Sequence, residues 1–196
     1  MGYCLAFEPY KQNILLQVLD EILNKRARPS EISRISIKVN SQLLQARALN
    51  DLLLAHPCPA SVSRFSFRLK NNADSCNSLV NCRSSGLRVS TAAGSTAAML
   101  SAGGFVMPIL SKELQYMVRE PILPMGSNAT MMHGWVRSDQ TIEITWSSKE
   151  GFAYIDGSYV THPIKHGDVI ELSSSAPVLK IFLSPHLLSA NEPAKL

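Results

Sequence analysis

Residues 89 to 104, VSTAAGSTAAMLSAGG, are the part of the sequence best suited to hold a ligand through backbone groups. They are nearly all Gly, Ala, Ser and Thr, and none is charged. A glycine turn at Gly94 that enters a helix, with Ser95 or Thr96 as the N-cap, would present unpaired backbone N–H groups. Such groups bind polar or anionic ligands. A tightly packed structural turn without a ligand explains the same residues equally well.

Two acidic positions elsewhere lie beside turn-forming residues. Asp51 follows Asn50 in ALNDLLLAHP, and Asp156 precedes Gly157 in AYIDGSYV. Taken alone, the first pattern is typical of a turn closed by an Asn or Asp side chain. The second is typical of a tight β-hairpin turn.

Composition argues against several other kinds of site. The net charge of +4 is spread along the chain, and no basic face with interleaved aromatic residues indicates a nucleic-acid partner. No apolar run reaches the roughly 20 residues of a membrane span. Cysteines 4, 58, 76 and 82 have no CxxC spacing, and His56 with Cys58 lacks the second pair of a zinc site. We therefore expect no metal ligands, no membrane contact and reduced thiols in an intracellular compartment.

The elements that must position these residues are mostly strands. Residues 11–24, KQNILLQVLDEILN, carry the apolar stripe of one amphipathic helix, which Pro29 ends. Afterwards the apolar period changes to two, and turn signals separate the short strands, as in an antiparallel sandwich or barrel. Residues 110–117 are expected to form a short turn or helix. The expected strands are 34–40, 64–70, 141–146, 153–160 (two strands joined by a turn), 168–172 and 178–183.

Together these motifs resemble a known family. LRVSTAAGSTAAMLSAGG is similar to the NAD kinase signature, in which a strand leads to a Ser-Thr-Pro-Thr-Gly-Ser-Thr-Ala-Tyr loop followed by Ser-Ala-Gly-Gly. ALNDLLLAHP resembles the family's Asn-acid motif, and AYIDGSYV its late Asp-Gly strand. The resemblance is closest to the plant-type NADH kinases and covers essentially all 196 residues.

The resemblance implies a fold and an activity. Family members transfer the γ-phosphate of ATP, with Mg²⁺, to the adenosine-ribose 2′-hydroxyl of NAD⁺ or NADH. They have an N-terminal α/β domain and a C-terminal all-β domain, and this chain resembles the second. We expect a mainly β, sandwich-like domain with a linker helix and a short loop-to-helix segment. The implied boundaries are an interdomain linker at 1–30, an NAD(H)-binding domain at 31–186 and a mobile tail at 187–196.

The resemblance also implies binding residues. Asn50 and Asp51 would hold the ribose hydroxyls, because a carboxylate beside an amide can accept from both. Small loop residues would let NAD(H) lie against the backbone, and Asp156 would lie near the nicotinamide end, often across a subunit interface. The full implied set is Asn50, Asp51, Arg83, Thr91, Gly94, Ser95, Thr96, Ala97, Ser101 and Asp156.

The chain departs from the family pattern at several positions. The Arg-x-Asp-Gly motif becomes CRSSG, which keeps Arg83 but places Ser85 at the acid. The loop's Pro-Thr becomes Ala92-Ala93, and its tyrosine becomes Ala98. With Ser85 at the position of the acid, the binding site would be less negative at the nicotinamide end, which would favour NADH over cationic NAD⁺. The hypothesis predicts that Ser85→Asp shifts preference toward NAD⁺.

A further departure concerns catalysis. The family's Gly-Gly-Asp-Gly motif cradles ATP and carries the general base, and the only Gly-Gly here is Gly103-Gly104, followed by Phe105. No catalytic residue can therefore be assigned. We expect the C-terminal half of an NADH/NAD kinase, which binds the dinucleotide and oligomerises, with a dimer favoured. The alternatives are a non-catalytic NAD(H)-binding module or regulatory partner, and an unrelated β-sandwich.

The last three residues resemble a targeting signal. Ala194-Lys195-Leu196 resembles the Ser-Lys-Leu signal that the peroxisomal import receptor reads. We expect a peroxisomal location, with a cytoplasmic one otherwise.

Overall fold

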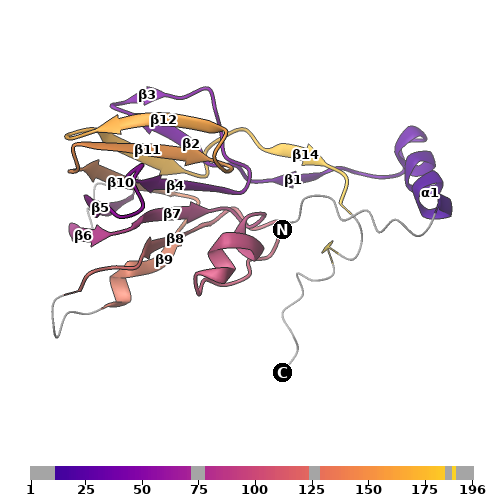
Figure 1. Ribbon diagram of the computed structural model, residues 1–196. Coiled ribbons are helices and arrows are strands. Elements are labelled where there is room, and N and C mark those ends of the chain that lie inside the picture. Colours follow the sequence, from indigo (N-terminus) through magenta and orange to yellow (C-terminus); the bar gives the residue numbers. More distant parts are fainter. Residues whose placement is uncertain (1–11, 72–77, 124–128, 184–186, 189–196) are drawn as a thin grey trace.

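The computed structural model describes residues 12–71, 78–123, 129–183 and 187–188. Two six-stranded antiparallel sheets face each other, and a small two-stranded sheet extends from them (Figure 1). The expected mainly β, antiparallel sandwich-like fold is confirmed.

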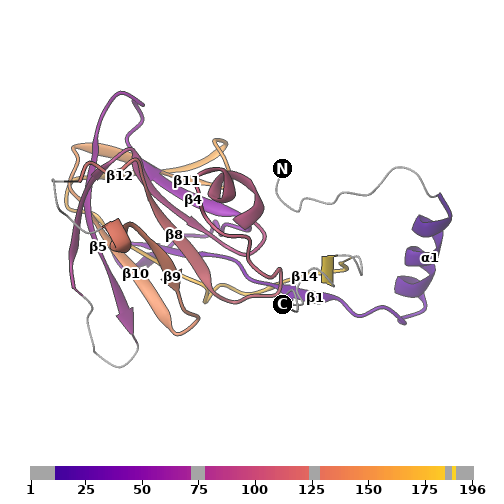
Figure 2. The same ribbon diagram turned by 90° about the horizontal axis from the view of Figure 1, so that it is seen from below.

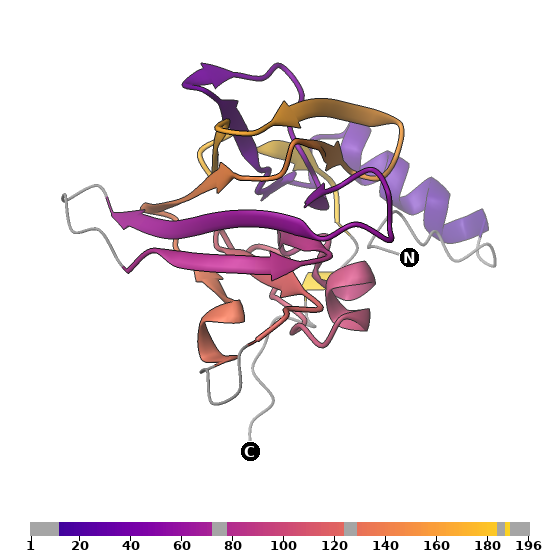
Figure 3. The same ribbon diagram turned by 60° about the vertical axis from the view of Figure 1, so that its left-hand side comes forward.

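The first sheet has the strand order β3-β2-β13-β10-β5-β6. Its longest pair, β5 with β10, matches Phe65 to Trp146 and Asn71 to Gln140 in register. The β5 and β6 strands run antiparallel along the near side of the molecule in Figure 3. The bounds are β2 (Ser36–Val39), β3 (Gln42–Leu43), β5 (Ser63–Asn71), β6 (Val80–Ser84), β10 (Gln140–Trp146) and β13 (Val169–Ser173).

The second sheet has the order β12-β11-β4-β7-β8-β9. Its two central strands, β4 and β7, carry parts of two of the three sequence motifs on which the family resemblance rests. The bounds are β4 (Asp51–Ala55), β7 (Gly86–Ser90), β8 (Leu114–Arg119), β9 (His133–Val136), β11 (Glu150–Ile155) and β12 (Val160–Lys165).

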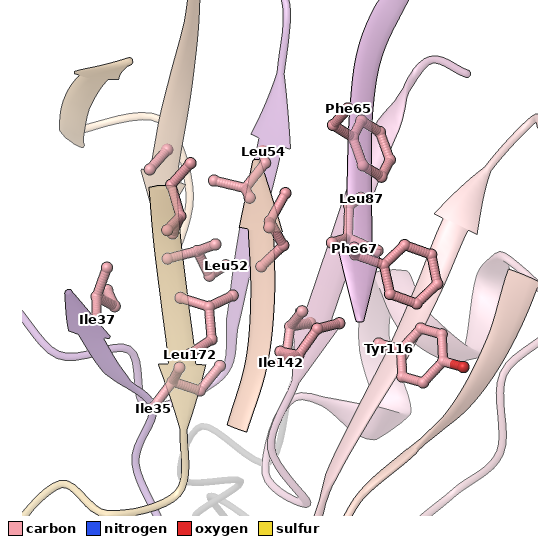
Figure 4. Close-up of a cluster of buried hydrophobic side chains, with 14 of the residues drawn as sticks. Ile35, Ile37, Leu52, Leu54, Phe65, Phe67, Leu87, Tyr116, Ile142 and Leu172 are labelled. Carbon is pink, nitrogen blue, oxygen red and sulfur yellow. The ribbon is translucent and has the colours of Figure 1, made fainter. Parts of the chain in front are cut away.

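The core lies between the sheets because alternate residues of each strand point inward. Phe65 and Phe67 from one sheet and Leu52 and Leu54 from the other are at most 2% exposed. Phe67 meets Tyr116 of the opposite sheet edge to face, with ring centroids 5.3 Å apart. Figure 4 shows this apolar layer, which fixes the two sheets against each other.

The expected helix forms as α1 (Gln12–Leu23) and lies apart from the sheets (Figures 1 and 2). A two-stranded arm of β1 (Ser30–Ile32) and β14 (Leu179–Ile181) lies between them. The apolar positions Leu16, Leu19 and Leu23 are 66%, 44% and 79% exposed, so no described residue covers this part of the stripe.

Two local expectations are wrong. Residues 110–117 were expected to form a short turn or helix, but from Leu114 onward they form a strand, β8 (Leu114–Arg119). Five of its six residues are buried, so the strand lacks the alternation that marks a half-exposed strand. The turn closed by an Asn or Asp side chain at LNDLLL is not formed among the described residues, since Asp51 begins β4 and its side chain pairs with Arg88. Ala129–Met132 forms a 3₁₀ turn, η2.

Candidate functional site

Strand pairing brings the Asn-Asp motif against the small-residue loop. The register of β4 with β7 places Asp51 opposite Ser90, so Asn50 meets Thr91 at the same end. The Thr91 N–H donates to the Asn50 carbonyl at 2.9 Å, and the Thr91 hydroxyl donates to the Leu49 carbonyl at 2.5 Å. Two segments forty residues apart therefore form one surface.

Gly94 is required by this close approach. A Cβ at Gly94 would lie 2.2 Å from the Asn50 carbonyl oxygen and 2.5 Å from its carbon. Its φ of −84° is ordinary, so the constraint is space and not conformation. Any larger residue would separate the loop from β4.

The loop continues into an irregular helical segment, η1 (Ser95–Met99), and not into a regular helix. The expected N-cap at Ser95 or Thr96 is wrong, because Gly94 holds that position without a side-chain cap. The Ser95 hydroxyl is instead buried, donating to the Ala92 carbonyl at 2.7 Å and accepting from the Met107 N–H at 2.9 Å. It ties the start of the loop to the segment that follows it.

The remaining predicted loop residues, Ala97, Ser101 and Thr96, differ in backbone geometry and hydrogen bonding. Ala97 breaks the helical geometry at φ −108°, ψ −120°. The Ser101 hydroxyl donates to the Ala97 carbonyl at 3.2 Å. The Thr96 hydroxyl oxygen is buried without a hydrogen-bond partner in the described part of the chain.

Asp156 joins the same surface from a third segment. It lies in the four-residue turn 156–159 between β11 and β12 at φ 51°, followed by Gly157 at φ 112°, and both residue types tolerate positive φ. Its carboxylate accepts the backbone N–H groups of Leu49, Asn50 and Asp51 at 2.7, 2.7 and 3.1 Å. Asp156 is therefore a turn residue that also holds the Asn-Asp segment.

Asp51 forms an ion pair that the sequence did not predict. Its carboxylate contacts the Arg88 guanidinium, and the two side chains are 20% and 15% exposed. Burial raises the pKa of Asp51 above its ordinary value, Arg88 opposes the rise, and the nearby Asp156 carboxylate adds to it. A charged residue inside the apolar strand LRVS was the available signal for Arg88.

Two polar groups remain for a ligand. The Asn50 side-chain amide and the second Asp51 carboxylate oxygen make no hydrogen bond within the described ranges. A carboxylate accepts and an amide both donates and accepts, so the pair suits a diol such as a ribose.

The structure does not bring Arg83 or Ser85 to this surface. Ser85 lies directly before β7 and Thr91 directly after it, so they are about 20 Å apart at ~3.3 Å per residue. Arg83 lies in β6, a strand of the other sheet. Arg83 is exposed and opposite Arg64 in register, and the Ser85 N–H donates to the Arg119 carbonyl. Within one chain, neither contacts the Asn-Asp segment.

Two depressions of about 670 and 380 Å³ lie away from this surface, the first beside Trp135 and Arg137 and the second beside Phe152 and Lys165. Among the described residues, no group of three or more His, Cys, Asp or Glu could hold a metal ion. No described helix is long and apolar enough to cross a membrane. Ala194-Lys195-Leu196 lies outside the described residues.

Known proteins resemble this chain in sequence and in fold. Residues 19–183 match the family described as the ATP-NAD kinase C-terminal domain. The chain is 58% identical over 172 residues to a probable NADH kinase of Oryza sativa subsp. japonica, covering 88% of this chain and 53% of that protein. It is 60% identical over 169 residues to the NADH kinase of Arabidopsis thaliana, covering 86% and 53%. The chain thus spans about half the length of these relatives.

Solved structures agree on the fold. Yeast NADH kinase complexed with NADH superposes with a TM-score of 0.73 at 17% identity, covering 91% of this chain and 51% of that one. An NAD kinase from Archaeoglobus fulgidus in complex with ATP gives a TM-score of 0.68 at 19% identity, covering 91% and 64%. With the family match extending over 19–183, the chain belongs to the ATP-NAD kinase C-terminal domain family.

Proposed function

We propose that this chain is the dinucleotide-binding part of an NADH/NAD kinase, which phosphorylates the adenosine-ribose 2′-hydroxyl of NADH and, less well, NAD⁺. The observation that carries the proposal is the 58–60% identity to two plant proteins named as NADH kinases. The surface made by Asn50, Asp51 and the loop after Thr91 supports it, because it offers an unpaired amide and a carboxylate oxygen to a ribose.

Phosphoryl transfer would need residues of this chain for dinucleotide binding and residues outside it for catalysis. Mg·ATP is the phosphoryl donor, and transfer needs an acid or base near the 2′-hydroxyl. Of the described acids near the surface, Asp156 accepts three backbone N–H groups, and Asp51 pairs with Arg88 through one oxygen and offers the other as an acceptor to a ribose hydroxyl. We therefore assign this chain dinucleotide binding and no catalytic base.

The test is a kinase assay on the chain with Mg·ATP and either NADH or NAD⁺, coupled to an NADP-specific dehydrogenase. The proposal expects NADH binding with little or no turnover by the chain alone. It expects turnover once a segment carrying Gly-Gly-Asp-Gly, taken from a plant relative, precedes it. Failure of that longer protein to form NADPH would overturn the proposed activity.

A second candidate is a non-catalytic NAD(H)-binding module or regulatory partner. It fits the same surface, to which we assign dinucleotide binding and no catalytic base. Mixing the chain with a full-length plant relative separates the two readings. A regulatory partner changes the relative's turnover number as the chain is added, whereas an independent half-enzyme leaves it unchanged.

We further propose self-association as a dimer and delivery to peroxisomes. Sedimentation of the purified chain tests the first, and a mass of 21.5 kDa at every concentration would refute it. The second rests on the resemblance of Ala194-Lys195-Leu196 to a peroxisomal signal. A fluorescent protein fused before the chain should enter peroxisomes, and deletion of Leu196 should release it to the cytoplasm.

A further inference from the structure

We propose that Arg88 is a positioning residue for Asp51, holding one carboxylate oxygen so that the other faces the ribose of the dinucleotide. This inference rests on the proposed function, because it takes Asp51 as the acceptor for a ribose hydroxyl.

The strand register explains how Arg88 reaches Asp51. Arg88 lies opposite Leu53 in β4, and its neighbours Leu87 and Val89 are fully buried in the core. Arg88 must therefore point to the outer face of the sheet, where alternation also places Asp51. There its guanidinium Nη1 donates to Asp51 Oδ2.

The neighbours of the pair are largely apolar. The cross-strand row through Arg88 contains Leu53 on one side and Met117 on the other, with Tyr154 beyond Leu53. Met117 is 8% exposed. An ion pair among such groups is screened weakly by water, so its geometry is held more firmly than that of a surface pair.

Arg88 also opposes two effects that disfavour the ionised carboxylate. Burial raises the pKa of Asp51, and the Asp156 carboxylate, which faces it from the β11–β12 turn, raises it further. Arg88, from β7, acts in the opposite direction through its charge and its hydrogen bond. Without Arg88, Asp51 would be protonated at a higher pH and its side chain would lose its fixed orientation.

Arginine suits this position better than lysine. Its planar guanidinium offers several donors in a fixed arrangement, whereas an ammonium is a flexible point charge. The Arg88 Nε is buried and has no hydrogen-bond partner in the described part of the chain. The guanidinium therefore keeps one donor that no described residue uses.

The first experiment needs no ligand. Carbonyl-detected NMR of the chain labelled with ¹³C-aspartate would give the titration of Asp51 in the wild type, Arg88→Met and Arg88→Lys. We expect Arg88→Met to titrate at a clearly higher pH and Arg88→Lys to fall between the two. An Asp51 titration that is unchanged in folded Arg88→Met would overturn the proposal.

The second experiment is a double-mutant cycle read out by NADH fluorescence at pH 7.5. Loss of a hydrogen bond to a charged group predicts roughly 10- to 100-fold weaker NADH binding by Arg88→Met. In an Asp51→Asn background the same change should add almost nothing, because Arg88 acts through Asp51. An equal loss in both backgrounds would contradict this. Arg88→Lys, which keeps the charge, should lose less than Arg88→Met.

Arg68→Met is the matched control. It removes an arginine from a cross-strand ion pair with Glu143 on the other sheet, where Lys70 remains as a second partner. The NADH affinity of Arg68→Met should stay at the wild-type value. The binding of NADH by Arg88→Met should weaken further as the pH falls. A wild-type chain that binds no NADH would overturn the proposed function, and the NMR titration would then decide alone whether Arg88 controls Asp51.

Discussion

The clearest consequence of the site geometry concerns Asp156. Its carboxylate accepts three consecutive backbone N–H groups, from Leu49, Asn50 and Asp51. Replacing Asp156 with Ala removes all three bonds and places a Cβ-bearing residue without local hydrogen bonding at φ 51°. The change should therefore loosen the segment that carries the proposed ribose-binding residues.

The magnitude follows from the bonds lost. A net contribution of about 0.5–1.5 kcal/mol for each bond gives about 1.5–4.5 kcal/mol for three, and the solvent-exposed position favours the lower part of this range, about 2 kcal/mol. The left-handed backbone adds about 1 kcal/mol for alanine. We expect Asp156→Ala to lower the free energy of unfolding by about 3 kcal/mol, measured by urea denaturation, and to weaken NADH binding.

Two variants separate the contributions. Asp156→Gly removes the carboxylate without the backbone cost, so it should lose about 1 kcal/mol less than Asp156→Ala. Asp156→Asn tolerates the same φ and keeps one acceptor oxygen, so it should lose least. If the alanine variant unfolds within about 0.5 kcal/mol of the wild type, the three bonds do not hold this segment and the reasoning fails.

Three further outcomes are expected. Gly94→Ala should cost about 2 kcal/mol or more in urea denaturation, because its Cβ would meet the Asn50 backbone, whereas Gly103→Ala, with open space but φ 94°, should cost about 1. For Glu143, burial alone would raise the pKa, but hydrogen bonds from Lys70 and Arg68 hold it below the ordinary value of 4.5. Its ionised form therefore stabilises the fold above that value, and the advantage of the wild type over Glu143→Gln should shrink as the pH falls below 4.5; a constant difference from pH 6 to pH 3 would refute this. Burial raises the pKa of the Cys82 thiol to about 11, so iodoacetamide at pH 8 should label the exposed Cys58 and spare Cys82, as peptide mass spectrometry would show.

Much of the fold follows from local pattern. The helix at Gln12–Leu23 and strands such as β5 and β10 show clear apolar periods of 3.6 or two. Strand β8 does not, because burial on both faces removes the alternation. Its assignment depends on strand pairing, which no local period encodes.

The site was predicted less completely than the fold. Motif resemblance identified Asn50, Asp51 and the loop after Thr91, and the β4–β7 register brings them together. The role of Ser95 as a buried bridge and the Arg88–Asp51 pair depend on contacts between segments far apart in sequence. Arg83 and Ser85 lie near the motifs in sequence but at the other end of β7 in space.

The most direct test of the central claim is a fluorescence titration with NADH of Asn50→Ala, beside urea denaturation of the same protein. The Asn50 backbone makes the structural hydrogen bonds, while its side-chain amide has no partner in the described ranges. We predict an unfolding free energy within about 0.5 kcal/mol of the wild type and NADH affinity weaker by roughly tenfold or more. Unchanged NADH affinity in this stable variant would contradict the assignment of the surface as the dinucleotide site.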